Sequence, residues 1–326
     1  MSADRFAGVR AQKTAVDILE RAVATDRVAS AYLFEGPSGV GKQLAARALA
    51  ERVIGADDKA RARISAGTHP DVRIFEPRAE GKRNIAVETL RQEILPVAQF
   101  APFEAKAAFL IFPEADVSFP EHPPESANAL LKTLEEPRRG VHFILLSERP
   151  DRLLPTIRSR CQRVRFGRLP APVLDDILAA HGLDEEARGP AIALADGRAD
   201  RALALAEGGA TELLDAALAL DEVCTVGKPG EMVRASEDLV RGEAELRVVL
   251  EALVTFYRDV AAAALGLGDE RLAFRHRADV IRERAERVGA RKAAERVEMI
   301  QEALVALERN GNAQIVVDSL IYGARV

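Results

Sequence analysis

The sequence predicts an α/β domain with a parallel sheet and a phosphate-binding loop, followed by a C-terminal half made of helices alone. Three observations support this prediction. Short apolar runs alternate with helical patterns in the first half, and a glycine-rich loop follows the first of these runs. Proline and phenylalanine then become rare: 13 of the 16 prolines and 10 of the 12 phenylalanines lie at or before Pro170.

The apolar runs predict the strands of the sheet. Continuous apolar runs separated by helices are what a parallel sheet covered on both faces requires. After Pro190 only Pro229 interrupts a long stretch of Ala, Leu, Arg and Glu at helical spacing, which predicts helices to the end of the chain. The four predicted strands are residues 31–34, 72–75, 109–112 and 142–146.

Composition restricts the function classes. The chain has 326 residues, 48% hydrophobic and 30% charged, enough for two domains or a large one with appendages. Its net charge of −5 argues against a surface coated with nucleic-acid-binding charge, so any DNA contact should be local. Two cysteines are too few for a disulfide framework, and no apolar run approaches the ~20 residues of a membrane span. We therefore expect a cytoplasmic protein with no membrane partner.

The first motif of chemical interest is the glycine-rich segment 36–43, Gly-Pro-Ser-Gly-Val-Gly-Lys-Gln. Glycines let backbone N–H groups close around phosphate oxygens, the following helix presents its positive end, and a lysine reaches the outer phosphates. A nucleotide site is therefore predicted here. Its residues are Gly36, Gly39, Gly41, Lys42 and Gln43.

Two positions that normally serve magnesium are altered. Gln43 stands where a Ser or Thr hydroxyl binds the metal in such loops. The strand 109–112 runs into Pro113, where a magnesium-associated aspartate belongs, although Glu114 and Asp116 follow. These two carboxylates are open to two interpretations, a solvated loop or catalytic groups. The sequence predicts a phosphate cradle without a complete metal site, and no metal ligands are assigned.

The order of four further segments resembles the bacterial DNA polymerase III clamp-loader family of AAA+ proteins. The altered magnesium positions make the chain similar to the delta-prime type of that family rather than to its gamma/tau motors. The resemblance covers about residues 6 to 206, and the segments 257–259 and 310–312 also resemble the family's collar. The four segments are Tyr32–Pro37, His69–Val72, Asn128–Pro137 and Leu154–Cys161.

The resemblance implies three domains and several site residues. The domains are an AAA+-like P-loop domain over 1–166, a helical lid over 167–207 and a helical collar over 208–326. Arg160 resembles the family's arginine finger, which acts in trans on a neighbour's ATP site. Ser147 and Arg201 occupy the positions of two residues that sense nucleotide. Each of these residues also has a simpler interpretation. Arg160 would form a surface salt bridge, Ser147 would be a serine at a strand end, and Arg201 would be an arginine on a helix surface.

The chain departs from the family in two places. Relatives often carry a four-cysteine zinc module, whereas residues 50–68 contain no cysteine, so no zinc is predicted and His69 is interpreted as a hydrogen-bonding loop residue. The segment 117–126 is lengthened and contains three prolines, which predicts a stiff exposed loop whose role stays open.

Three functions fit these observations. The first is a delta-prime-like subunit that supports ring assembly and completes a neighbour's ATP site, with gamma/tau and delta subunits as partners and the sliding clamp and primer-template DNA reached through the complex. It requires no cofactor. If its loop binds ATP or ADP, we expect the nucleotide not to be hydrolysed efficiently. The alternative is an ATP-hydrolysing motor of the gamma/tau type. An unrelated P-loop phosphotransferase is opposed by the segment 154–161 and by the helical second half.

Overall fold

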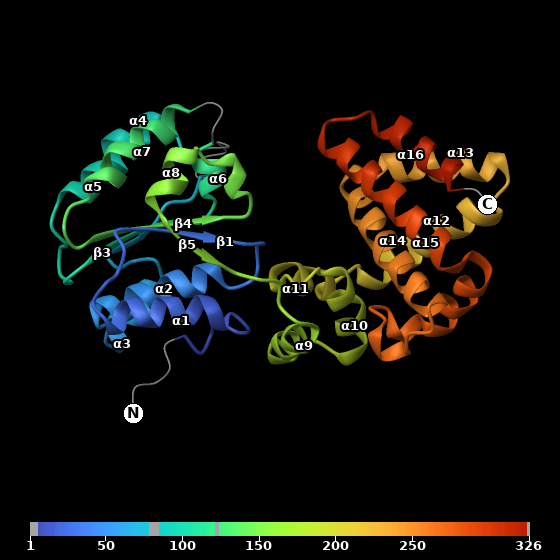
Figure 1. The fold of residues 1–326 in the computed structure, drawn as a ribbon, viewed down its shortest axis with the longest axis horizontal. Helices are drawn as coiled ribbons and strands as arrows, with labels where there is room; N and C mark the ends of the chain where they lie inside the picture. Colours follow the sequence, from blue (N-terminus) through green and yellow to red (C-terminus); the bar gives the residue numbers. More distant parts are fainter. Residues whose placement is uncertain (1–5, 78–84, 121–123, 325–326) are drawn as a thin grey trace. The chain divides into compact units, whose positions relative to one another are not determined.

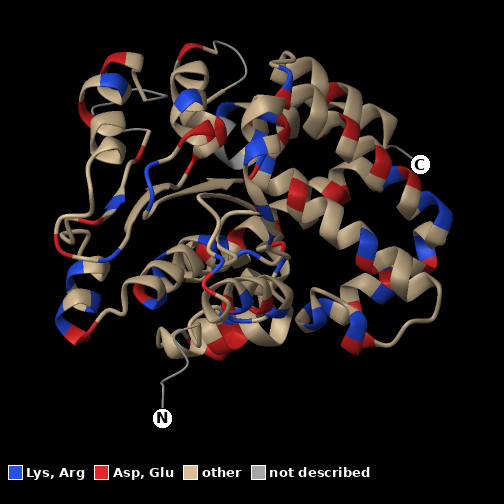
Figure 2. Ribbon diagram, turned by 60° about the vertical axis from the view of Figure 1, so that its left-hand side comes forward, with Lys and Arg blue, Asp and Glu red and all other residues tan. Residues whose placement is uncertain are grey.

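The computed structural model describes residues 6–77, 85–120 and 124–324. The chain divides into two compact units, an N-terminal unit over residues 1–170 and a helical unit over residues 171–326 (Figure 1). Basic and acidic residues are interspersed along the helices of both units (Figure 2). Within the described part of the chain, no helix has the length and apolarity needed to cross a bilayer. The finer boundary between lid and collar at residues 207 and 208 stays a prediction.

The N-terminal unit is built on a five-stranded parallel sheet with the strand order β2-β3-β4-β1-β5. The four apolar runs all form strands, which confirms the predicted fold class. The fifth strand was not predicted, because it lies at the sheet edge and buries only Val164. The strands are β1 (Ala31–Glu35), β2 (Val72–Ile74), β3 (Ala108–Phe112), β4 (Val141–Ser147) and β5 (Gln162–Arg165).

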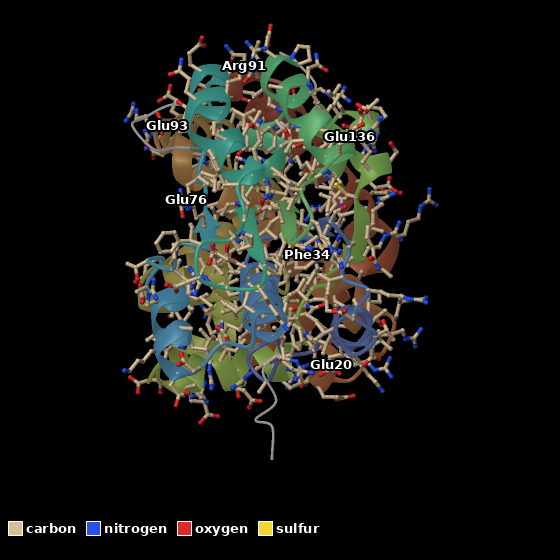
Figure 3. The ribbon with its side chains drawn as sticks, turned by 90° about the vertical axis from the view of Figure 1, so that its left-hand side faces the viewer. Glu20, Phe34, Glu76, Arg91, Glu93 and Glu136 are labelled. Carbon is tan, nitrogen blue, oxygen red and sulfur yellow. The ribbon has the colours of Figure 1, made fainter. Side chains whose placement is uncertain are left out.

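Helices cover both faces of this sheet, and each face has its own apolar cluster (Figure 1). Phe34 of β1 is fully buried in the first cluster and lies in the interior of the view in Figure 3. The first face carries α1 (Lys13–Ala24), α2 (Lys42–Ile54) and α3 (Asp58–Ser65). The second carries α4 (Val87–Thr89), the π-helical turn η2 (Leu90–Ile94), α5 (Leu95–Gln99), α6 (Ala115–Ser118), α7 (Glu125–Glu135) and α8 (Pro155–Arg160).

A buried carboxylate explains the His-Pro-Asp segment. Asp71 is 4% exposed, and its two oxygens accept the backbone N–H groups of three consecutive residues, 103–105, at 2.5–2.9 Å. The preceding His69 accepts the N–H of Asp71 through Nδ1 at 3.1 Å, in keeping with its predicted hydrogen-bonding role. This segment therefore fixes the loop that leads into β3.

The two described ends of the segment 117–126 differ from the stiff exposed loop that its prolines predict. Its first two residues lie in α6, and Phe119 is fully buried with its ring centroid 5.1 Å from that of Phe112. At the other end Ser126 lies in α7 and donates to the carbonyl of Ser118 at 3.0 Å. The prediction failed because a buried aromatic outweighs the local effect of neighbouring prolines. Residues 121–123 lie outside the described residues.

The helical unit forms around one continuous apolar cluster, as the spacing of its Ala and Leu residues predicts. Its longest helix is interrupted at Gly289, whose φ of +74° only glycine adopts readily. The helices are α9 (Ala171–Ala180), α10 (Glu185–Leu194), α11 (Ala199–Glu207), α12 (Ala210–Val226), α13 (Pro229–Arg241), α14 (Glu243–Ala264), α15 (Ala278–Glu308) and α16 (Ala313–Gly323).

A buried polar network joins three of these helices. Asp221 of α12 is 1% exposed and accepts the hydroxyl hydrogen of Tyr257 of α14. Two arginines of α15 complete it: Arg284 lies 2.6 Å from one carboxylate oxygen and Arg296 3.5 Å from the other. Arg296 also donates to the Tyr257 hydroxyl at 2.5 Å. The network gives Tyr257, singled out in the sequence, a structural role.

Candidate functional site

The glycine-rich loop connects β1 to α2 at the carboxyl edge of the sheet, where open α/β sheets bind ligands. Gly39 and Gly41 have φ values of +66° and +99°, in the left-handed region. Gly36 is required for a second reason, since a Cβ there would lie 2.3 Å from the carbonyl oxygen of Phe166, just after β5. The loop therefore depends on glycine for both its conformation and its close packing.

Lys42 begins α2 and is 7% exposed. Its Nζ donates to the carbonyl oxygen of Gly36 at 2.5 Å and to that of Pro37. The ammonium is thus held inside the loop, at the N-terminus of a 13-residue helix whose first N–H groups and dipole favour an anion. Gln43 follows on the first turn of α2 and is partly exposed. The glycines, the helix N-terminus and the lysine that a phosphate cradle requires therefore lie together.

Gln12, which the sequence reasoning missed, connects three segments around the loop. Its side chain is buried and donates to the carbonyls of Val40 and Gly167 at 3.3 and 2.7 Å. Its Oε1 accepts the N–H of Gly167 at 2.9 Å. A single glutamine outside any recognised motif gives no sequence signal for such a role.

The strand ends beside the loop bring further predicted residues together. Ser147 ends β4, its carbonyl accepts the N–H of Gly36 at 3.1 Å, and its buried Oγ makes no hydrogen bond to the described residues. After β3, Asp116 accepts the N–H of Glu148 at 3.3 Å. Ser147 therefore lies next to the loop, whereas Asp116 is engaged by the chain that follows β4.

A bidentate ion pair stabilises the start of the loop. Glu35, the last residue of β1, is 6% exposed. Its carboxylate accepts two hydrogen bonds from Arg163 on β5, one from Nε and one from Nη2, and the Nη2 bond is 2.9 Å long. These hydrogen bonds and the charge of Glu35 raise the pKa of the Arg163 guanidinium. The pair was not predicted, because the two residues lie 128 positions apart.

Arg160 is the last residue of α8, and its side chain is 33% exposed. Its Nη1 donates to the carbonyl of Thr156 at 2.9 Å, and its Nη2 is ion-paired with Oε1 of Glu135 on α7. The next residue, Cys161, is 8% exposed, and burial raises the pKa of its thiol to about 12, which disfavours the reactive thiolate. Arg160 thus lies at the surface while its guanidinium is held in place.

The remaining predicted residues lie elsewhere. Arg201 lies on α11 of the helical unit, where its guanidinium is ion-paired with Glu251 of α14. Its assignment to nucleotide binding stays a prediction. His69 Nε2 lies 3.3 Å from Glu104 Oε1, and the described residues contain no group of three His, Cys, Asp or Glu side chains placed to hold a metal.

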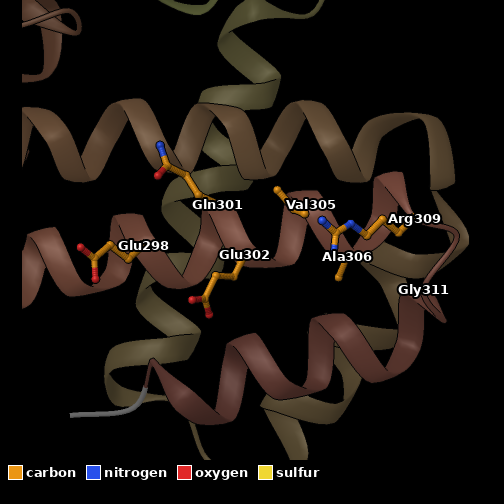
Figure 4. A pocket seen from close by; sticks show the side chains of 7 residues that line it. All are labelled: Glu298, Gln301, Glu302, Val305, Ala306, Arg309 and Gly311. Carbon is orange, nitrogen blue, oxygen red and sulfur yellow. The ribbon is translucent and has the colours of Figure 1, made fainter. Parts of the chain in front are cut away.

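The helical unit also contains an open groove of about 730 Å³ along the end of α15 (Figure 4). Its lining runs from Glu298 through Val305 to Arg309 and Gly311. Val305 is 44% exposed, so the groove presents an apolar centre between charged ends. It bears none of the residues predicted to bind nucleotide.

Comparison with known proteins identifies the N-terminal unit. Residues 11–170 match the family described as DNA polymerase III, delta subunit. Over 175 residues the chain is 32% identical to DNA polymerase III subunit delta' of Bacillus subtilis, covering 51% of each chain. Over these residues the chain resembles the delta' subunits of DNA polymerase III. The predicted resemblance is confirmed.

Two further relatives extend the comparison. Subunit delta' of Pseudomonas aeruginosa is 39% identical over 142 residues, which are 41% of this chain and 42% of that protein. DNA polymerase III subunit gamma/tau of Mycobacterium tuberculosis is 32% identical over 185 residues, 53% of this chain and 30% of that protein. The chain thus spans about half the length of these delta' relatives or less.

Proposed function

We propose that this delta-prime-like protein is a clamp-loader subunit that does not hydrolyse ATP efficiently itself and supplies Arg160 to the ATP site of a neighbouring subunit. The observation that carries the proposal is the contrast between two parts of one domain. The glycine-rich loop and Lys42 form a phosphate cradle. Gln43 and Pro113 occupy the two positions whose side chains contact magnesium in P-loop proteins that hydrolyse ATP.

The location of Arg160 supports the second part of the proposal. It ends a short helix on the surface of the N-terminal unit, and its planar guanidinium suits the charge that spreads over a transferring phosphoryl group. A neighbour that presents its nucleotide to this surface would gain a charge that its own chain lacks. The partners in this proposal are gamma/tau and delta subunits, with the sliding clamp and primer-template DNA engaged by the assembled complex.

Isolated chain should show no appreciable ATP hydrolysis. Magnesium neutralises charge on the outer phosphates, so losing both of its usual protein contacts removes most of the rate enhancement. The measurement is steady-state phosphate release by the purified chain with ATP and magnesium. Lys42→Ala is the matched control, because turnover that persists in this variant belongs to a contaminant. Steady turnover that disappears on Lys42→Ala would support the motor hypothesis instead.

A further inference from the structure

The ends of two helices meet at the proposed finger. Arg160 is the last residue of α8 and Glu135 the last residue of α7, and their side chains form an ion pair. Thr156, one turn earlier in α8, accepts the second Arg160 nitrogen at 2.9 Å. A guanidinium carries five N–H donors, so the two that are engaged leave three for another ligand.

Both anchors are fixed by the core. Leu130 and Leu134 of α7 are 0% and 4% exposed, and Ile157 of α8 is fully buried in the same apolar cluster. Glu135 itself is 47% exposed and Arg160 is 33% exposed, so the pair lies where an incoming group can reach it. The carboxylate therefore holds a surface arginine from a rigid helix end without covering it.

Helix stability does not account for Glu135. A carboxylate in the last turn of a helix lies at the negative end of the helix dipole, where a cation is favoured. An ion pair of this exposure also contributes little to folding. What the pair does provide is orientation, because a free arginine side chain populates many rotamers whereas this one is fastened at two nitrogens.

We propose that Glu135 is the positioning residue of Arg160: it holds the guanidinium in the orientation in which its remaining N–H donors meet the phosphates of a neighbouring subunit's nucleotide. This inference rests on the proposed function. It also gives Glu135 of the Leu-Glu-Glu-Pro segment a role, which the packing of the neighbouring leucines does not.

The test uses the complex assembled with motor and delta subunits, and measures ATP hydrolysis stimulated by clamp and DNA. Glu135→Ala should lower the rate about 3- to 10-fold at the ATP site that receives Arg160, because the finger is misoriented while nucleotide binding is untouched. The rate of the whole complex should therefore fall by less than it does in Arg160→Ala, with KM for ATP within about twofold. The matched control is Glu136→Ala. Glu136 is the adjacent exposed carboxylate, visible on the outside of the domain in Figure 3, and it forms no ion pair with the described residues. Its replacement should leave the rate of the complex at the wild-type value.

A double-mutant comparison separates positioning from a structural effect. If Glu135 acts through Arg160, the double variant Glu135→Ala/Arg160→Ala should hydrolyse ATP at the rate of Arg160→Ala alone. Glu135→Gln keeps an acceptor of the same size, so it should fold, assemble and recover part of the lost rate.

Two results overturn the inference. One is an unaltered rate in Glu135→Ala and Glu135→Gln complexes while Arg160→Ala is strongly impaired, which leaves the proposed function intact. The other is a Glu135→Ala defect of equal size in the presence and absence of Arg160. An unimpaired Arg160→Ala complex would instead count against the proposed function itself.

Discussion

Replacing Arg160 with alanine is expected to leave the chain folded and assembled while removing most ATP hydrolysis at one site of the complex. The side chain is one-third exposed, and its polar partners Thr156 and Glu135 are themselves exposed, so its loss should barely change stability. An arginine supplied in trans raises the rate of ATP hydrolysis about 10³- to 10⁵-fold at the site that receives it. The defect of the whole complex should be smaller, because other sites continue to turn over.

The measurements for this variant are clamp- and DNA-stimulated ATPase, clamp loading, and co-elution with the partner subunits. Arg160→Lys should restore little, because an ammonium lacks the planar fork of the guanidinium. Arg158, which lies two residues earlier on α8 and is partly buried, is the comparison residue. Undiminished hydrolysis and loading by Arg160→Ala complexes would exclude the trans role and make Arg158 the next residue to test.

The largest loss of stability is expected from Asp221→Ala in the helical unit. The substitution leaves the guanidinium groups of Arg284 and Arg296, 7% and 4% exposed, without their buried carboxylate. Removing one partner from a buried charged network costs about 3–5 kcal/mol. Urea denaturation followed by circular dichroism should show that decrease in the free energy of unfolding, with incorporation into the complex weakened accordingly.

A matched control exists within the same network. Glu222 also pairs with Arg284, at 2.7 Å, but its side chain is 54% exposed. Glu222→Ala should therefore cost no more than about 1 kcal/mol, as exposed ion pairs do. Equal effects of the two substitutions would show that burial does not govern the energetics of this cluster.

The sequence predicted the elements that depend on local pattern. Four strands were visible as apolar runs, and the cradle was visible because its glycines and lysine have fixed spacing. The strand β5 was missed, since Val164 is its single buried residue and an edge strand gives no apolar run. The exposure predicted for 117–126 was wrong at Phe119, because the burial of this residue depends on Phe112, which is adjacent only in space.

The contacts that hold the site together were beyond sequence reasoning for one physical reason. Each joins residues far apart in the chain whose types are common on protein surfaces. Arg160 and Glu135 are 25 positions apart, and Gln12 and Gly167 are 155 apart. The requirement for Gly36 was predicted from the phosphate loop, but its packing against Phe166 follows only from the pairing of β1 with β5.

In the proposed function, this chain contributes Arg160 to ATP hydrolysis at a neighbour's site and does not hydrolyse ATP efficiently at its own. The most direct measurement compares ATP hydrolysis by complexes assembled with wild-type chain, with Lys42→Ala and with Arg160→Ala, each confirmed to contain all subunits. The proposed function predicts a rate close to wild type for Lys42→Ala and a rate for Arg160→Ala that is lower by the contribution of the one site that receives the arginine. The opposite pattern, with Lys42→Ala impaired and Arg160→Ala unaffected, would contradict it.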